Sequence, residues 1–89
     1  DLLQYGIVSR VVPDAELMAV AQQLADEIAA NAPLATRAVK RMLRTSANED
    51  FEAHVHRLFL QVMHVLRSED CKEGVSAFLE KRAPEWKGR

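Results

Sequence analysis

The sequence predicts an all-α fold of about four helices, preceded by a single strand-like segment at residues 7–12. Three observations support this prediction. After Pro13, apolar residues recur three and four positions apart, which is the period of an amphipathic helix. Polar and proline-containing breaks divide these runs, and the whole chain holds only three glycines. Only the segment before Pro13 is enriched in β-branched residues, which favour strands.

The strand-like segment has the sequence IVSRVV and follows Gly6. Glycine at this place suits the left-handed backbone position just past a helix end. A single strand cannot satisfy its own hydrogen-bonding ladder, and no other part of the chain resembles a strand. Two interpretations stay open: the sheet partner lies upstream of residue 1 in a longer protein, or the segment is an extended N-terminal arm.

The first predicted helix covers roughly residues 14–31, with Asp14 as its capping residue. Its apolar stripe consists of Leu17, Val20, Ala21, Leu24 and Ile28. Pro33 ends this helix, because proline disfavours helical geometry in the residue before it. The same proline can begin the next helix, at residues 33–44. Two adjacent apolar rows there predict burial on a broad face: Leu34, Ala38 and Met42, and Ala35, Val39 and Leu43.

The third helix is expected at residues 48–67, after a polar break that holds capping residues. It has the clearest amphipathic pattern in the chain, formed by Phe51, Val55, Leu58, Phe59, Val62, Met63 and Leu66. The fourth helix is expected at residues 70–82, where Asp70 and Glu73 fit a capping box. Its apolar face is Cys71, Val75, Phe78 and Leu79, and Pro84 lies just beyond its end.

The composition is that of an ordinary globular domain with almost no net charge, and so with no strong overall electrostatic field. The 89 residues are 48% hydrophobic and 28% charged, with a net charge of −1. This balance selects neither nucleic acid nor a membrane as a partner, and no apolar run approaches the roughly 20 residues of a membrane span. The single Cys71 excludes an internal disulfide and fits a reducing compartment, so we expect a cytoplasmic location.

No residues form a recognisable catalytic or metal-binding constellation. His54 and His56 point to different sides of the third helix, and His64 lies two turns further along. We therefore predict surface histidines, no metal site and no catalytic residue within this chain. Cys71 near a helix start has two interpretations, a reactive thiol or a small buried hydrophobe, and its place on the apolar face favours the second.

A basic stripe is a sharper feature of the second helix. It consists of Arg37, Lys40, Arg41 and Arg44, at the spacing that places side chains on one helical face. It could bind phosphate groups of a nucleic acid or a phosphorylated ligand. The absence of interleaved aromatic residues and the slightly acidic balance favour an ordinary solvated face, and we expect no nucleic-acid partner.

Phe78 and Lys81 stand one turn apart on the fourth predicted helix. An aromatic face with a lysine at its edge suits a flat heteroaromatic ring that carries a nearby phosphate. On spacing alone, a core phenylalanine beside a surface lysine is the more common explanation.

Several motifs resemble the C-terminal third of the crotonase family, the enoyl-CoA hydratases and isomerases. They are the Gly-Ile-Val segment leading into Val-Val-Pro at residues 6–13, the Ala-Pro-Leu-Ala entry to the second helix at 32–35, and the stretch from Ser68 to Trp86. That last stretch includes Ser68-Glu69-Asp70, Glu73-Gly74, Ala77-Phe78 and Glu80-Lys81-Arg82. The resemblance covers nearly the whole chain.

The resemblance implies a function that composition and periodicity do not. Family members have an N-terminal ββα-spiral core with oxyanion-hole amides and catalytic carboxylates, so residues 1–13 would be the remnant of that core. Residues 14–89 would be the helical trimerisation domain, which helps to close the acyl-CoA pocket. This fragment alone would be inactive in an enoyl-CoA hydratase-like lyase that acts on CoA thioesters without a covalently bound cofactor. The parent would be a homotrimer or a dimer of trimers.

The resemblance also assigns Phe78 and Lys81 to the adenosine-phosphate end of CoA, across a subunit boundary. Where some hydratases have an aromatic residue that also lines this site, the sequence has Val62. Other reactions of the family stay open for the parent: isomerisation, thioester hydrolysis, decarboxylation and C–C cleavage. A free-standing helical interaction module is the alternative from another functional class.

Overall fold

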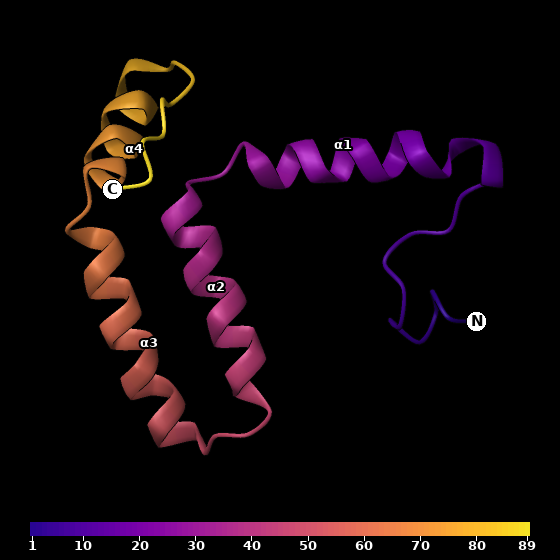
Figure 1. The fold of residues 1–89 in the computed structure, drawn as a ribbon, viewed down its shortest axis with the longest axis horizontal. Helices are drawn as coiled ribbons and strands as arrows, with labels where there is room; N and C mark the ends of the chain where they lie inside the picture. The colour runs from indigo at the N-terminus through magenta and orange to yellow at the C-terminus, as the bar shows by residue number, and fades with distance from the viewer. The chain divides into compact units, whose positions relative to one another are not determined.

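The computed structural model describes all residues from Asp1 to Arg89 and consists of helices, turns and extended segments (Figure 1). A short 3-10 helix, η1, spans Asp14–Glu16. The α-helices are α1 (Leu17–Ala29), α2 (Pro33–Ser46), α3 (Phe51–Leu66) and α4 (Glu69–Glu80). The predicted all-α class with four helices is therefore confirmed. The chain divides into two compact units, Asp1–Ala30 and Asn31–Arg89. None of its helices has the length and apolarity needed to cross a membrane.

The strand predicted at residues 7–12 is wrong as an element of this structure. The segment has no strand pairing, and the chain folds just before it into a turn in which the Ile7 N–H bonds the Leu2 carbonyl at 2.9 Å. Gly6 does take the predicted left-handed conformation, with φ of 70°. The reason for the error is that β-branched composition reports fitness for packing in a sheet, and no second strand is present to form one.

The ends of α1 and α2 differ from the predicted ones. Asp14 is not a capping residue: it lies inside η1, which follows Pro13, and no side chain caps that turn. α1 ends at Ala29, two residues before the predicted end. α2 continues to Ser46, because the Ser46 hydroxyl donates to the Leu43 carbonyl at 2.9 Å and so supports the last turn. Hydroxyl groups often bond the preceding turn in this way.

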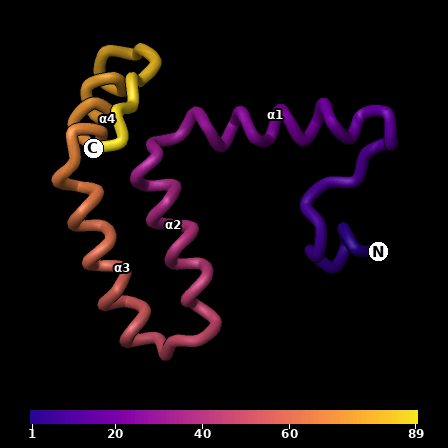
Figure 2. Tube along the Cα trace, viewed as in Figure 1, coloured from indigo at the N-terminus to yellow at the C-terminus, as the bar shows by residue number.

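α3 begins at Phe51, three residues after the predicted start at residue 48, and ends at Leu66, one residue before the predicted end; its cap, Asp50, is the last residue of the polar break that was expected to hold capping residues. The Asp50 carboxylate accepts a hydrogen bond from the Ala53 N–H at 2.8 Å, which satisfies one of the unpaired donors of the first turn. α2 and α3 then run side by side in opposite directions (Figures 1 and 2). Arg41 of α2 donates to Gln61 of α3 at 2.8 Å. The two helices form an antiparallel hairpin in the second unit.

The core of the second unit is small. The buried apolar residues are Ala38 and Met42 of α2 and Ala77 of α4. Many large apolar side chains of the same helices stay exposed, namely Val39, Leu43, Phe51, Val55, Leu58, Phe59, Leu60, Val62, Leu66, Val75, Phe78 and Leu79. So many exposed large apolar side chains on three helices suggest surfaces that another part of a protein covers.

Candidate functional site

The site is built on α4 and on the chain that follows it. Ser68 caps the helix: its hydroxyl accepts from the Cys71 N–H at 3.0 Å and donates to the Val65 carbonyl at 2.6 Å. The prediction that Asp70 is the capping residue is therefore wrong. Ser68 precedes it by two residues and satisfies the first-turn N–H, which leaves the Asp70 carboxylate free for another partner.

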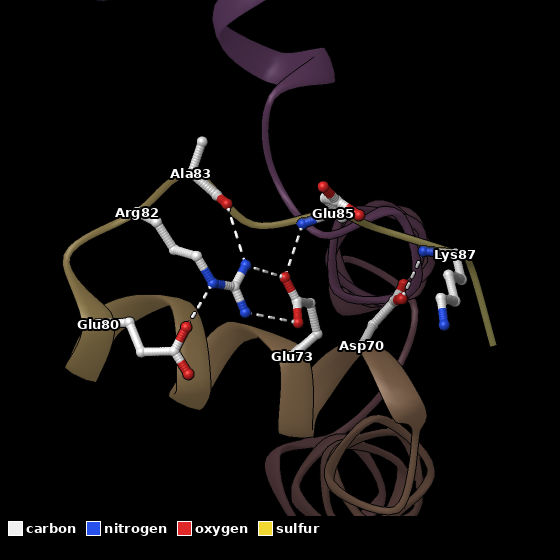
Figure 3. Close-up of polar contacts among 7 residues, drawn as sticks. All are labelled: Asp70, Glu73, Glu80, Arg82, Ala83, Glu85 and Lys87. Carbon is white, nitrogen blue, oxygen red and sulfur yellow. Dashed lines mark hydrogen bonds and ion pairs between the residues drawn. The ribbon is translucent and has the colours of Figure 1, made fainter.

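That partner is the end of the chain. Asp70 is only 2% exposed, and its two carboxylate oxygens accept from the backbone N–H groups of Lys87 at 2.7 Å and Gly88 at 2.8 Å. The Asp70 N–H in turn donates to the Arg89 carbonyl at 3.1 Å. We call residues 83–89 the tail. Asp70 holds the tail against the start of α4, as Figure 3 shows for the bond to Lys87.

A second carboxylate one turn further along α4 holds the beginning of the tail. Glu73 accepts two hydrogen bonds from the Arg82 guanidinium, at 2.5 Å and 3.0 Å, and one from the Glu85 N–H at 2.8 Å (Figure 3). Arg82 also donates to Glu80 at 2.7 Å and to the Ala83 carbonyl at 3.2 Å. Paired bonds between arginine and a carboxylate fix geometry as well as charge. We call Asp70, Glu73 and Arg82 together the tail clasp.

The clasp changes the acid–base properties of Glu73. The hydrogen bonds from Arg82, helped by the Glu85 N–H, lower the pKa of Glu73 from 4.5 to about 2, against the opposing effect of partial burial. The same pairing raises the pKa of Arg82 above its usual value. Since the folded state favours the ionised Glu73, the Glu73–Arg82 pair stabilises the fold fully only above the ordinary glutamate pKa.

This shift predicts an acid-dependent loss of stability. As the pH falls from 4.5 towards 2, Glu73 becomes protonated in the unfolded state but stays ionised in the folded state. The contribution of Glu73 to the free energy of unfolding is therefore lost across that range. Urea unfolding between pH 5 and pH 2 should show a steeper loss of stability for the wild-type chain than for Glu73→Gln. Arg82→Ala should give the same flattened dependence, and parallel profiles for all three would contradict the assignment.

The reversal between α4 and the tail lies at Lys81. Its backbone is left-handed, with φ of 54° and ψ of 41°, and it is the only residue other than glycine with a positive φ. The Arg82 N–H bonds the Ala77 carbonyl at 3.0 Å and so closes the helix end. Glycine is the usual residue at such a position. The helix was expected to reach residue 82, but it ends at Glu80, and Lys81 stands outside it.

A groove of about 330 Å³ lies along the apolar face of α4. Its lining residues are Ala32, Leu34, Ala35, Val65, Ser68, Asp70, Cys71, Gly74, Val75, Phe78, Leu79 and Trp86. Phe78 is 82% exposed at its edge, so the prediction from spacing alone that it is a core residue is wrong for this chain. Cys71 is half-buried in the same groove, with no partner for a disulfide. The groove offers an apolar and aromatic wall.

Val62 does not line the groove that holds Phe78. It lines a neighbouring groove of about 270 Å³ between α2 and α3, together with Val39, Met42 and Leu58, and Ala35 and Val65 line both grooves. Phe78 and Lys81 stay predicted ligand contacts.

The other candidate residues are dispersed. His54 lies 3.5 Å from Glu49, while His56 and His64 are exposed. Glu49 also accepts from Arg57 at 2.7 Å, and this pairing lowers the pKa of Glu49. In the basic stripe, Arg41 bonds Gln61, and the stripe as a whole is exposed. No group of three or more histidine, cysteine, aspartate or glutamate side chains is placed to hold a metal ion.

Sequence reasoning missed the tail clasp. Asp70 and its tail partners are 17 and 18 residues apart, beyond the range of any helical spacing rule. One signal was present: Glu73 and Arg82 carry opposite charges, and Pro84 lies two residues beyond Arg82. Because the helix ends at Glu80 and not at the predicted residue 82, the chain reverses after Glu80 and brings the two side chains together.

Comparison with known proteins agrees with the resemblance seen in the sequence. The whole chain is similar to carnitinyl-CoA dehydratases of Proteus mirabilis, at 45% identity, and of Escherichia coli K12, at 44%, and spans 36% of each. A probable enoyl-CoA hydratase/isomerase from Mycobacterium abscessus has a similar structure, with a TM-score of 0.91 and 42% identity over 100% of this chain and 35% of that one. An enoyl-CoA hydratase from Bacillus anthracis gives a TM-score of 0.93 at 33% identity, over 99% of this chain and 34% of that one.

The chain thus spans about a third of the length of the relatives that it matches. The enoyl-CoA hydratase/isomerase family matches it over residues 1–89. The motif-bearing segment from Ser68 to Trp86 is the part that forms α4, the left-handed reversal and most of the tail. This chain belongs to the enoyl-CoA hydratase/isomerase family.

Proposed function

We propose that residues 1–89 form the C-terminal assembly and CoA-site-closing region of a longer enoyl-CoA hydratase-like enzyme. The observation that carries the proposal is the family match along the whole chain, together with coverage of only about a third of each relative. Residues 1–13 would belong to the spiral core of that enzyme, and residues 14–89 to its helical trimerisation domain. On its own, this region is inactive.

The exposed apolar faces of α2, α3 and α4 support the assembly role. A chain with so few buried apolar residues gains stability by covering these faces with the rest of the enzyme or with other subunits. The expected assembly is a homotrimer or a dimer of trimers, in the cytoplasm. Its partners are its own subunits and the acyl-CoA substrate, and it needs no covalently bound cofactor.

The proposed reaction is the addition of water to a 2-enoyl-CoA thioester, or its reverse. The relatives support this class, because a carnitinyl-CoA dehydratase removes water from a CoA thioester. General acid–base groups and an oxyanion hole in the upstream core would perform the chemistry. Isomerisation, thioester hydrolysis and C–C cleavage are the alternative reactions for the parent, and a free-standing helical module is the alternative for this chain.

Within that reaction, Phe78 and Lys81 bind the nucleotide end of CoA. The exposed Phe78 ring supplies a flat apolar surface for the adenine, and the Lys81 ammonium pairs with a phosphate. Neither group touches the reacting atoms. Both therefore act on substrate binding and leave the chemical step unchanged.

Lys81→Ala in the full-length enzyme is expected to raise KM for an enoyl-CoA about tenfold with little change in kcat. The loss of one charge-assisted contact to phosphate is worth about 1.5 kcal/mol, which corresponds to roughly that factor. Steady-state kinetics and calorimetric binding of CoA would measure it.

Lys72→Ala is the matched control, since it removes the same charge from an exposed position near the start of α4. It should leave KM unchanged. An unaltered KM and Kd in Lys81→Ala would remove Lys81 from the site and with it the CoA-closing part of the proposal.

A further inference from the structure

We propose that the Glu73–Arg82 ion pair is a positioning device that presents Lys81 to the phosphate of its ligand, with Asp70 as its second anchor. The inference rests on the proposed function, because it needs Lys81 to meet an anion. It assigns positioning roles to residues that do not themselves touch the substrate.

The first observation is the backbone of Lys81. A left-handed conformation is unfavourable for every residue with a Cβ, and glycine would adopt it freely. The backbone conformation alone would therefore favour glycine at residue 81, but the chain has a lysine there. Unfavourable backbone conformations persist where the surroundings hold them, and they concentrate at functional sites.

The second observation is the distribution of charge around the reversal. Arg82 is neutralised by two carboxylates, those of Glu73 and Glu80. Lys81, which lies between Glu80 and Arg82, is exposed, and its side chain takes part in none of the side-chain hydrogen bonds and ion pairs of this turn. The pairing of its neighbours leaves Lys81 as the unpaired positive charge at this turn. Lys81 can therefore bind an anion without first breaking an ion pair to a carboxylate of its own chain.

The third observation is that the chain is anchored on both sides of Lys81. On the helix side, the Lys81 N–H bonds the Phe78 carbonyl at 3.3 Å, and the Arg82 N–H bonds the Ala77 carbonyl. On the tail side, Glu73 holds both the Arg82 side chain and the Glu85 N–H (Figure 3). Asp70 then binds the tail at residues 87 and 88, so the tail is also attached at the start of α4.

These anchors reduce the cost of binding. A lysine on a free chain end must lose the freedom of its backbone and its side chain when it binds an anion. With its backbone held in place, Lys81 loses only side-chain freedom. The more the clasp orders the Lys81 backbone before binding, the more it should increase the affinity for the CoA thioester.

The test uses the full-length enzyme and an enoyl-CoA substrate. Arg82→Ala should raise KM about two- to tenfold, the range expected when one ordered side chain becomes free, and should leave kcat unchanged. Arg82→Lys should recover only part of the loss, since lysine keeps the charge but lacks the paired donors. Glu73→Gln breaks the same pair from the other side and should also raise KM. Arg57→Ala breaks a different arginine–glutamate pair, that with Glu49, and should not change KM.

A double variant shows whether the effect passes through Lys81. In a Lys81→Ala background, Arg82→Ala should add little further increase in KM, because the residue that it positions is already absent. Lys81→Gly should raise KM as much as Lys81→Ala does, yet should denature at the same or a higher temperature than Lys81→Ala, because glycine relieves the backbone.

The outcomes distinguish this inference from the proposed function. If Lys81→Ala leaves KM unchanged, the proposed CoA contact fails. If Lys81→Ala raises KM while Arg82→Ala and Glu73→Gln do not, the contact stands and the positioning role is overturned. Fully additive effects in the double variant, or a change in kcat with Arg82→Ala, would also overturn it.

Discussion

Replacing Asp70 by alanine is expected to lower the free energy of unfolding by about 3 kcal/mol, the lower end for two lost hydrogen bonds to a charged acceptor. Asp70 is almost fully buried, and both of its oxygens are used by the tail. The variant leaves the N–H groups of Lys87 and Gly88 without their acceptors, so the tail should detach from α4. Urea unfolding measures the stability, and hydrogen exchange at these two amides measures the detachment.

Asp50→Ala is a suitable control for the Asp70 variant. Asp50 is also an aspartate that accepts a backbone N–H, but it is exposed and serves only the start of α3. Its loss should cost about 1 kcal/mol, the usual value for a helix cap, and should leave exchange in the tail unchanged. Equal costs for the two variants, or a protected tail in Asp70→Ala, would contradict the role given to Asp70.

Gly74→Val is expected to expel the Trp86 ring from its place against α4 and to cost about 2 kcal/mol, within the usual range for overpacking. A Cβ on Gly74 would stand 3.1 Å and 3.3 Å from two carbons of that ring, closer than ordinary contact. Alanine gains about 1 kcal/mol of helix propensity over glycine, which offsets much of the contact at Cβ. Valine adds two methyl groups beyond Cβ and has few rotamers with which to avoid the ring.

The displaced ring can be followed directly, because Trp86 is the only tryptophan of the chain. Its fluorescence emission should shift to longer wavelength in Gly74→Val and stay close to the wild-type value in Gly74→Ala. Lys72→Val places the same side chain at an exposed position of α4 and reports the helix propensity of valine alone. An unshifted emission in Gly74→Val would show that the tail has room to accommodate the larger residue.

Helical periodicity was enough to predict the number and order of the α-helices, while their ends differ from the predicted ones by up to three residues. It identified α3, which begins at Phe51 and not at the predicted residue 48, because the signals there are local: an apolar stripe and a polar break that holds the capping residue Asp50. Residues 7–12 form no strand here because β-branched composition alone does not supply a second strand with which to pair. Asp70 was taken for a cap because a capping box requires only local spacing, whereas its true partners lie in the tail.

For the candidate site too, local features could be predicted from the sequence and non-local ones could not. Phe78 and Lys81 could be selected from an aromatic–lysine pair and a family resemblance, without any knowledge of the turn between them. The left-handed backbone of Lys81 was not predictable, because lysine carries no preference for it and the clasp that holds it is non-local. Local patterns thus identified the candidate contacts, and the structure showed what holds one of them in place.

The bond between Arg89 and the start of α4 also decides how the molecule carries a mechanical load. A pull applied at Arg89 passes directly to Asp70, through the bond of its N–H to the Arg89 carbonyl and the bonds of its carboxylate to the N–H groups of Lys87 and Gly88. These bonds close a loop that contains the rest of α4, the turn at Lys81 and most of the tail. This loop bears no tension until the bonds break. The segment that carries Phe78 and Lys81 is therefore shielded from a pull applied at Arg89.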